Sequence, residues 1–165
     1  MPDLSLATAA VVWFATQLVP SPEIAAAREG AVLGLRWQVT PVLWSFGVHR
    51  GVSPLRAFVA EPMVRHSGSV ELFVSPEYLA LRDTSGSMAD QWFLRPGVRA
   101  YFPLAQHGEY LSCSIGTSYA WGAERSGAAW EAGMYTLFGV LGVQITYSPT
   151  REPADVIATL SVRYF

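Results

Sequence analysis

The sequence contains no lysine and no asparagine, and it has few charged residues of any kind. Charged side chains make up 15% of the 165 residues, the 11 basic residues are all arginine, and the formal net charge is -2. Because nucleic-acid binding needs a basic patch, this composition argues against a nucleic-acid partner. The lack of asparagine excludes N-glycosylation.

Cysteine is also scarce, since Cys113 is the single one in the chain. One thiol cannot form an intramolecular disulfide and does not make a metal site. The G-x-S-x-G, P-loop, G-x-G-x-x-G and H-E-x-x-H patterns are absent as well. His49 and His107 fall in separate predicted connections, where we interpret them as solvated. We therefore expect neither a metal nor a cofactor.

A long apolar run is missing too, although 51% of the residues are hydrophobic and the mean hydropathy is +0.26. No clean stretch of 18 or more apolar residues is present, so no spanning helix is predicted. A chain of this length is expected to form one domain. It is either a very buried soluble domain or a β-barrel whose apolar residues occupy alternating positions.

The most apolar stretch covers residues 4–19, LSLATAAVVWFATQLV. A signal peptide would carry positive charge before such a stretch, but the only early charge is Asp3. Asp3 or Ser5 could cap a helix, and we predict a short helix lying at an interface or against the rest of the protein. A retained signal sequence and an extra strand are the alternatives. We expect residues 1–30 to form this segment and a linker.

From residue 31 onward, apolar and polar residues alternate with period two, which predicts β-strands. In the segment 92–102, for example, Trp92, Leu94 and Val98 occupy one face while Arg95 and Arg99 occupy the other. Clear alternation predicts strands at 33–40, 70–78, 92–102, 111–121, 143–148 and 156–164. Weaker alternation at 54–65 and 128–138 completes a set of about eight.

Pro41 interrupts the first of these segments. Beyond it the apolar face changes parity and is carried by Val42, Trp44, Phe46 and Val48. A β-bulge at Pro41 would produce this change. A hairpin at Thr40 and Pro41 is the alternative, and it would raise the number of strands.

The polar face of the alternation suits a narrow lumen better than a solvent-exposed surface. It combines small residues with a limited set of opposite charges, namely Arg36, Glu71, Glu77, Arg95, Arg99, Glu131 and Arg163. An unpaired buried charge is costly, whereas a soluble surface carries more charge, usually with lysine. We therefore predict a salt-bridged, closed lumen. A narrow ion path is the alternative, but eight strands leave room only for side chains.

Aromatic residues and connections suggest two different ends. Aromatic side chains lie near the ends of the apolar faces, as in interfacial girdles: Trp92, Phe102, Tyr119, Trp121, Tyr147 and Tyr164. The connections 49–53, 82–90, 122–127 and 149–155 hold most polar loop residues and are predicted on one side. Those at 66–69, 103–108 and 138–140 are shorter or plainer and are predicted on the other, periplasmic side.

With these features, residues 31–165 resemble the small eight-stranded bacterial outer-membrane β-barrel proteins. The C-terminal VRYF is similar to the recognition signal of that class, although Tyr164 rather than Phe165 has the apolar parity. The resemblance implies an all-β fold, an antiparallel up-and-down transmembrane barrel that follows residues 1–30. It also implies a porin-like protein in the outer membrane of a Gram-negative bacterium, with outer-membrane lipid as its partner.

Some barrels of this class are lipid-modifying enzymes that use serine and histidine, and RHSGSVE brings His66, Ser67, Ser69 and Glu71 together. A working nucleophile needs its base within hydrogen-bond reach. A polar turn explains the segment more simply, because Ser-Gly is a turn dipeptide and the segment falls on the predicted periplasmic side. We therefore predict no catalytic residue and do not expect an enzyme.

The leading functional prediction is a structural or interaction protein, or a small subunit of a membrane assembly with a protein partner. A lipid A-modifying acyl hydrolase or acyltransferase is one alternative. A soluble lipocalin-like carrier, with its apolar face inside, is the other.

Overall fold

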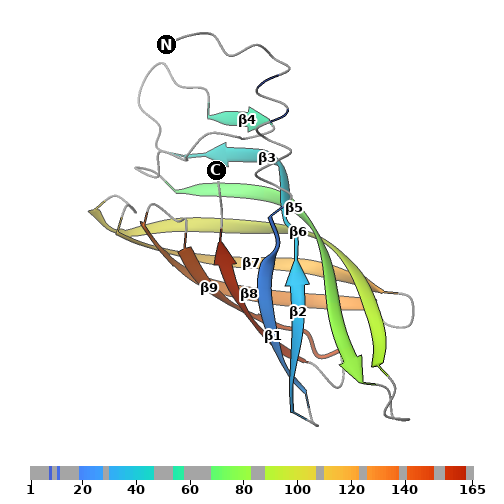
Figure 1. Cartoon of the computed structure of the whole chain (residues 1–165). Helices are drawn as coiled ribbons and strands as arrows, with labels where there is room; N and C mark the ends of the chain where they lie inside the picture. Colours follow the sequence, from blue (N-terminus) through green and yellow to red (C-terminus); the bar gives the residue numbers. More distant parts are fainter. Residues whose placement is uncertain are drawn as a thin grey trace.

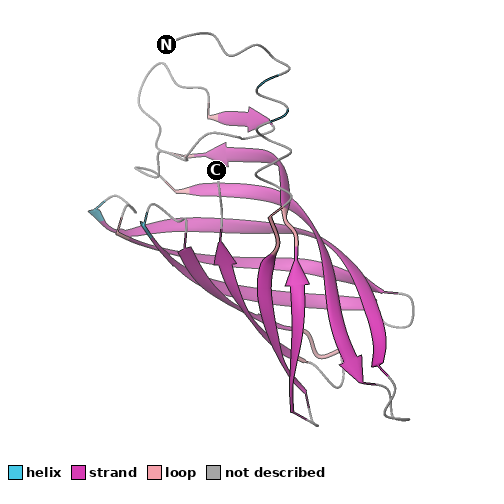
Figure 2. Ribbon diagram, viewed as in Figure 1, coloured by secondary structure: helices cyan, strands magenta, loops and turns pink. Residues whose placement is uncertain are grey.

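The structure is a computed structural model, and it describes residues 8, 11, 19–27, 30–46, 54–57, 68–82, 88–106, 110–122, 126–137, 141–150 and 155–162. Ten β-strands account for most of these residues (Figure 2). They are β1 (Ser21–Ala27), β2 (Gly30–Arg36), β3 (Val39–Ser45), β4 (Leu55–Ala57), β5 (Ser69–Arg82), β6 (Met88–Ala105), β7 (Leu111–Gly122), β8 (Ser126–Thr136), β9 (Leu141–Tyr147) and β10 (Val156–Val162).

Eight of these strands form a closed antiparallel barrel (Figure 1). The order around the wall is β2, β1, β10, β9, β8, β7, β6 and β5, and β5 pairs back onto β2. The six strands from β5 to β10 follow one another along the chain, and the β1–β2 hairpin closes the gap between β10 and β5. The predicted antiparallel up-and-down barrel of about eight strands is confirmed.

The two ends of the barrel differ in the chain segments that lie there. At the proximal end β1 begins and β10 finishes, and β3 and β4 lie beyond it (Figure 1). At the distal end the chain turns between β1 and β2, β5 and β6, β7 and β8, and β9 and β10. Three connections were expected to share one side, at 82–90, 122–127 and 149–155, and the strand ends that flank them do lie together at the distal end.

The strands β2 and β3 are two parts of one bent path along β5. β2 pairs with β5 at Gly34 to Arg36, and β3 pairs with an earlier part of β5. The register shifts between Val39 and Val42, which confirms the predicted bulge around Pro41, a residue with no backbone N–H to donate. Past the bulge, β3 pairs on its other edge with β4 and extends the sheet beyond the barrel.

Two strands differ from the sequence prediction. β1 lies within the expected linker. It was not predicted as a strand because its sequence SPEIAAA contains little alternation beyond Glu23 and Ile24. In the segment 54–65, the described strand is β4 alone, and it pairs with β3 rather than joining the barrel wall. The connection expected at 49–53 lies outside the described residues.

Most of the expected N-terminal apolar segment, residues 4–19, also lies outside the described residues. The same holds for Arg163, Tyr164 and Phe165 at the other terminus.

The strands are strongly tilted relative to the barrel axis. Following the pairs from Ala25 once around the wall returns to the ladder of β1 about ten residues further along. A closed sheet needs such a stagger, and it goes with a strand tilt of about 40°. A barrel of eight tilted strands has an interior that side chains fill.

The two faces of the wall differ in polarity in the sense that the alternation predicts. On β6, Leu94 and Val98 point outward and are 43% and 42% exposed, whereas Arg95 and Arg99 are fully buried. On β8 and β9 exposed and buried positions alternate without interruption. The interior is therefore polar and the outside apolar, the reverse of a soluble barrel.

Close packing inside the barrel makes Gly97 a sensitive position. A Cβ atom there would lie 2.5 Å from Cζ of Phe73 and 2.7 Å from both Cβ of Ser118 and the carbonyl oxygen of Thr117. We expect G97A to lower the free energy of unfolding by about 1–3 kcal/mol through overpacking, as measured by urea titration. Adding F73L should recover part of the loss, and a G97A barrel as stable as the parent would contradict this packing.

Candidate functional site: the sealed lumen and the apolar outer face

The distal end of the lumen is closed by apolar side chains. Ala25, Leu79, Phe93 and Ile157 form a buried cluster, and Val32 packs against it. These five residues, here called the apolar cap, come from β1, β2, β5, β6 and β10. Water and ions entering from the distal end would have to pass through this cap.

On the proximal side of the apolar cap, charged side chains meet at Glu131 of β8. Its Oε1 accepts hydrogen bonds from Nη2 of Arg36 at 3.3 Å and from Nη2 of Arg95. Its Oε2 accepts from Nη2 of Arg99 and from Nε of the same residue at 3.2 Å. Three guanidinium groups therefore converge on one carboxylate, and all four side chains are almost completely buried.

Two neutral side chains complete the surroundings of Glu131. Ser118 Oγ donates to Oε1 at 3.2 Å, and Gln144 Nε2 donates to Oε2 at 2.7 Å. Each carboxylate oxygen thus accepts three hydrogen bonds. A buried ion cluster is tolerated when its remaining lone pairs and protons are satisfied in this way.

Three further glutamates balance the arginines. Glu77 Oε2 lies 2.8 Å from Nη1 of Arg95, and Glu71 Oε1 lies 3.2 Å from Nη1 of Arg99. Glu23 is held less closely: its Oε1 accepts from Thr159 Oγ1 at 2.7 Å and lies 3.9 Å from Nη1 of Arg36. The residues Glu23, Arg36, Glu71, Glu77, Arg95, Arg99 and Glu131 are here called the charge network.

The charge network joins opposite walls of the barrel. Arg36 is on β2 and Glu131 is on β8, and four steps separate these strands in either direction around the wall. Arg95 and Arg99 reach Glu131 across the intervening strand β7. The network therefore fills the middle of the lumen.

Aromatic rings pack against the charge network. The guanidinium of Arg99 lies 4.5 Å from the centre of the Phe73 ring, a cation–π arrangement. Nearer the proximal end, the rings of Tyr101 and Tyr135 meet edge to face at 5.4 Å. Tyr101 donates its hydroxyl hydrogen to Glu71 Oε1 at 2.8 Å. Apolar cap, charge network and tyrosines together leave the lumen filled rather than open.

The structure brings together most of the residues that the sequence places in a lumen network. Six of them, Arg36, Glu71, Glu77, Arg95, Arg99 and Glu131, are in mutual contact through the bonds described above. Arg163 is outside the described residues.

The weak catalytic candidates do not form a site in the described part. Ser69 and Glu71 lie at the start of β5 and are 4% and 1% exposed, while His66 and Ser67 fall outside the described residues. The carboxylate of Glu71 already accepts hydrogen bonds from other side chains. Thr40 Oγ1 donates to its Oε2 at 3.0 Å, and Arg99 and Tyr101 donate to its Oε1. No described group activates a serine here.

Sequence reasoning missed several members of the lumen. Glu23 escaped because β1 was not recognised as a strand. Gln38 and Thr40 occupy polar positions of the predicted strand 33–40 but were left out because they carry no charge, and both side chains bind Glu71. Gln144 could have been found, since it occupies a polar position in the predicted strand 143–148.

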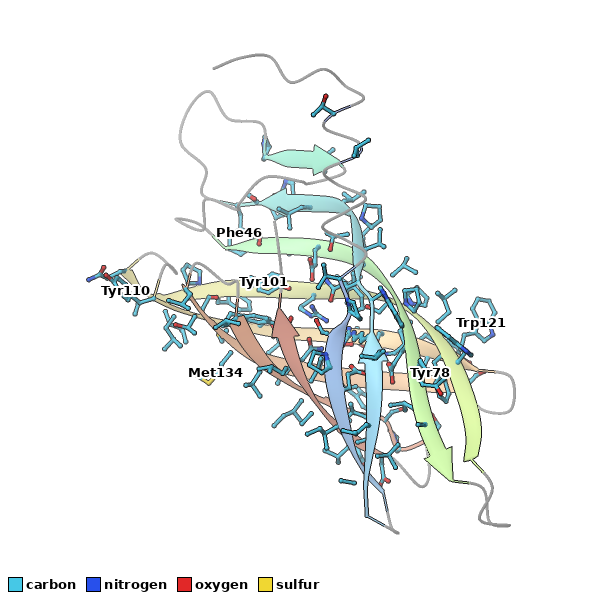
Figure 3. All side chains as sticks on the ribbon, in the orientation of Figure 1. Phe46, Tyr78, Tyr101, Tyr110, Trp121 and Met134 are labelled. Atoms are coloured by element: carbon cyan, nitrogen blue, oxygen red, sulfur yellow. The ribbon has the colours of Figure 1, made fainter. Side chains whose placement is uncertain are left out.

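The outer face carries an apolar band bordered by aromatic side chains. Near the distal end lie Tyr78, Trp92, Tyr119, Trp121, Trp130 and Tyr147, here called the distal belt, and near the proximal end lie Trp44, Phe102 and Tyr110. In Figure 3, Tyr78 and Trp121 lie toward one end and Tyr110 toward the other. Several of these rings touch: Tyr78 and Trp92 have centroids 5.2 Å apart, and Trp130 stacks on Tyr147 at 6.2 Å.

The height of the band follows from β6, which carries a residue of each aromatic group. Trp92 and Phe102 are ten residues apart, or about 33 Å along a strand at about 3.3 Å per residue. A tilt of about 40° reduces this to about 25 Å along the barrel axis. Exposed aliphatic side chains fill the interval: Leu72, Leu94, Val98, Ile115, Met134, Val143, Ile145 and Leu160.

Comparison with known proteins gives no relative: no protein-family model matches the chain, and no curated protein or solved structure is significantly similar to it. No helix among the described residues has the length and apolar character needed to cross a membrane. Nor do His, Cys, Asp and Glu gather within the described residues in a group that could hold a metal ion.

Proposed function

We propose that this chain is an integral membrane β-barrel of the bacterial outer-membrane type, with a sealed lumen, that serves as a structural or interaction protein. The apolar outer band carries the proposal. Its height of about 25 Å and its aromatic borders match what a barrel presents to hydrocarbon and to the two interfaces. Outer-membrane lipid is then the immediate partner, and a membrane assembly is the setting in which a small barrel without a pore would act.

The alternative of a soluble lipocalin-like carrier requires the opposite arrangement of side chains. Such a barrel keeps an apolar cavity inside for its ligand, whereas here the inside holds Arg95, Arg99 and Glu131 in mutual contact. Large exposed apolar surfaces on soluble monomers are rarely more than a few hundred Å². An apolar band that encircles the barrel supports a membrane protein instead.

A sealed lumen also supports interaction rather than transport. The apolar cap closes the distal end, and the charge network fills the middle with side chains that bind one another rather than a passing solute. A lipid-modifying enzyme would need a serine and a base that converge beside lipid, and the described residues offer none. The remaining roles use the barrel's surface and its ends, as an anchor or a subunit does.

Quenching of tryptophan fluorescence by brominated lipids tests the membrane proposal directly. We expect the chain to insert into phospholipid vesicles and its fluorescence to be quenched, because Trp92, Trp121 and Trp130 are exposed on the outer face. Bromine near the headgroup should quench more strongly than bromine near the end of the acyl chain, since the belts lie at the interfaces. A chain that stays monodisperse without detergent and is not quenched would contradict the proposal.

A further inference from the structure

The barrel wall is incomplete at its distal end, between β2 and β5. Pairing of these strands stops at Gly34 opposite Leu79, although β2 reaches back to Gly30 and β5 continues to Arg82. Over this stretch the described pairings of β2 are with β1, and those of β5 are with β6. The two hairpins diverge, as the lower part of Figure 1 shows. The opening between residues 30–33 and residues 80–82 is here called the β2–β5 slot.

The slot is lined by two kinds of surface, namely strand edges and apolar side chains. Within the described part of the chain, each flanking strand has one edge whose backbone N–H and C=O groups face the slot instead of a neighbouring strand, a ready template for pairing. The inner side of the slot is apolar, because Val32 and Leu79 belong to the apolar cap. On the outer side, Leu33 is 69% exposed. An occupant would therefore have to offer both hydrogen-bonding groups at strand spacing and apolar side chains.

We propose that the β2–β5 slot accepts an extended segment of a partner polypeptide as an added strand. A lipid acyl chain could cover Val32 and Leu79, but it has no N–H groups to satisfy the strand edges. An extended peptide provides donors and acceptors at the right spacing, and its alternate side chains can pack on the apolar cap. On β5 the slot begins at Ala80, two residues beyond Tyr78 of the distal belt, so it opens on the side of the belt away from the apolar band.

This interaction is distinct from membrane insertion, and the two can fail separately. The slot would bind a peptide in detergent micelles whether or not the natural setting is an outer membrane. Brominated-lipid quenching tests the band, and peptide binding tests the slot.

The experiment uses the full chain in micelles and a synthetic ten-residue peptide of alternating valine and threonine. A second peptide of the same sequence, N-methylated at alternate residues, keeps the apolar side chains but loses the donors of one edge. Binding is followed by fluorescence polarisation. To close the slot, cysteines replace Leu33 and Ala80, the next positions of the β2–β5 ladder after Gly34 and Leu79, with Cys113 changed to Ser.

The matched control is the pair V98C and T117C, again with C113S. These residues are exposed, lie directly opposite each other on β6 and β7, and are already paired in the wall. A disulfide there should leave the slot open. Slower migration on gels after boiling checks that each variant is a folded barrel.

We expect the unmodified peptide to bind the parent chain and the N-methylated peptide to bind at least tenfold more weakly. Oxidation of the L33C/A80C variant should weaken binding at least tenfold and reduction should restore it, while the control pair binds like the parent. Equal binding of the two peptides, no binding, or binding that persists after closure would overturn the proposal. So would a dimer that the L33C/A80C disulfide abolishes without any peptide binding, because a second copy would then occupy the slot.

Discussion

Replacing Glu131 by glutamine is expected to lower the free energy of unfolding by about 3–5 kcal/mol, the usual loss when one partner of a buried ion pair is removed. The reason is the position of its carboxylate, which is shared by Arg36, Arg95 and Arg99. A glutamine side chain fills the same space but carries no charge. Three buried guanidinium groups would then face one another with less compensating charge. Urea titration of the barrel in micelles, followed by tryptophan fluorescence, measures the effect.

Glu23 provides a matched control for this substitution. It is as deeply buried as Glu131, but its one ion pair, with Arg36, is 3.9 Å long, and its Oε2 has no hydrogen-bond partner among the described residues. Glutamine at this position can still accept a hydrogen bond from Thr159. We therefore expect E23Q to cost no more than about 1 kcal/mol, the net contribution of an ordinary hydrogen bond. Equal losses in E23Q and E131Q would show that Glu131 is not the centre of the charge network.

Replacing Val98 by arginine should also be strongly destabilising, by about 2–4 kcal/mol in a lipid bilayer, the loss measured for arginine near the midplane on the outside of a barrel. Val98 lies between Trp92 and Phe102 on β6 and is 42% exposed on the outer face. An arginine there would place its guanidinium in hydrocarbon. Urea titration of variants folded into phospholipid vesicles provides the measurement.

Leu104 tests whether depth in the membrane, rather than charge itself, causes the loss. It lies on the same strand and the same face but beyond Phe102, and it is 56% exposed. Near an interface the loss for arginine falls to about 0–1 kcal/mol. If V98R and L104R are both without effect, the apolar band does not contact lipid.

The parts of the fold that the sequence predicts are those where the two faces of a strand differ strongly. On β6 the apolar residues Leu94 and Val98 face outward while Arg95 and Arg99 face the lumen, so period two is visible in the sequence itself. A barrel of alternating strands follows from this pattern, and so does an interior in which arginines and glutamates pair. Even the bulge near Pro41 is visible, because one extra residue reverses which face is apolar.

The rest could not be read because the signal is weak or belongs to tertiary pairing. Three of the seven residues of β1 are alanine, which fits either face of a wall and so shows no alternation. β4 has three residues and is defined by its pairing with β3. Arg36, Arg95 and Arg99 each lie near a glutamate on a neighbouring strand, and all three also share Glu131. This sharing depends on the stagger of the strands. No local pattern encodes that stagger.

The brief contact between β2 and β5, three residue pairs long, has a consequence for the order in which the chain can assemble. The strands β5 to β10 are linked only by short connections and can form hairpin by hairpin from local contacts. The β1–β2 hairpin is made first during synthesis, yet its place in the wall requires Glu23 to meet Thr159, near the other end of the chain. Contacts between such distant residues form slowly. We expect a six-stranded open sheet to precede closure, with the earliest-made hairpin as the last piece to dock.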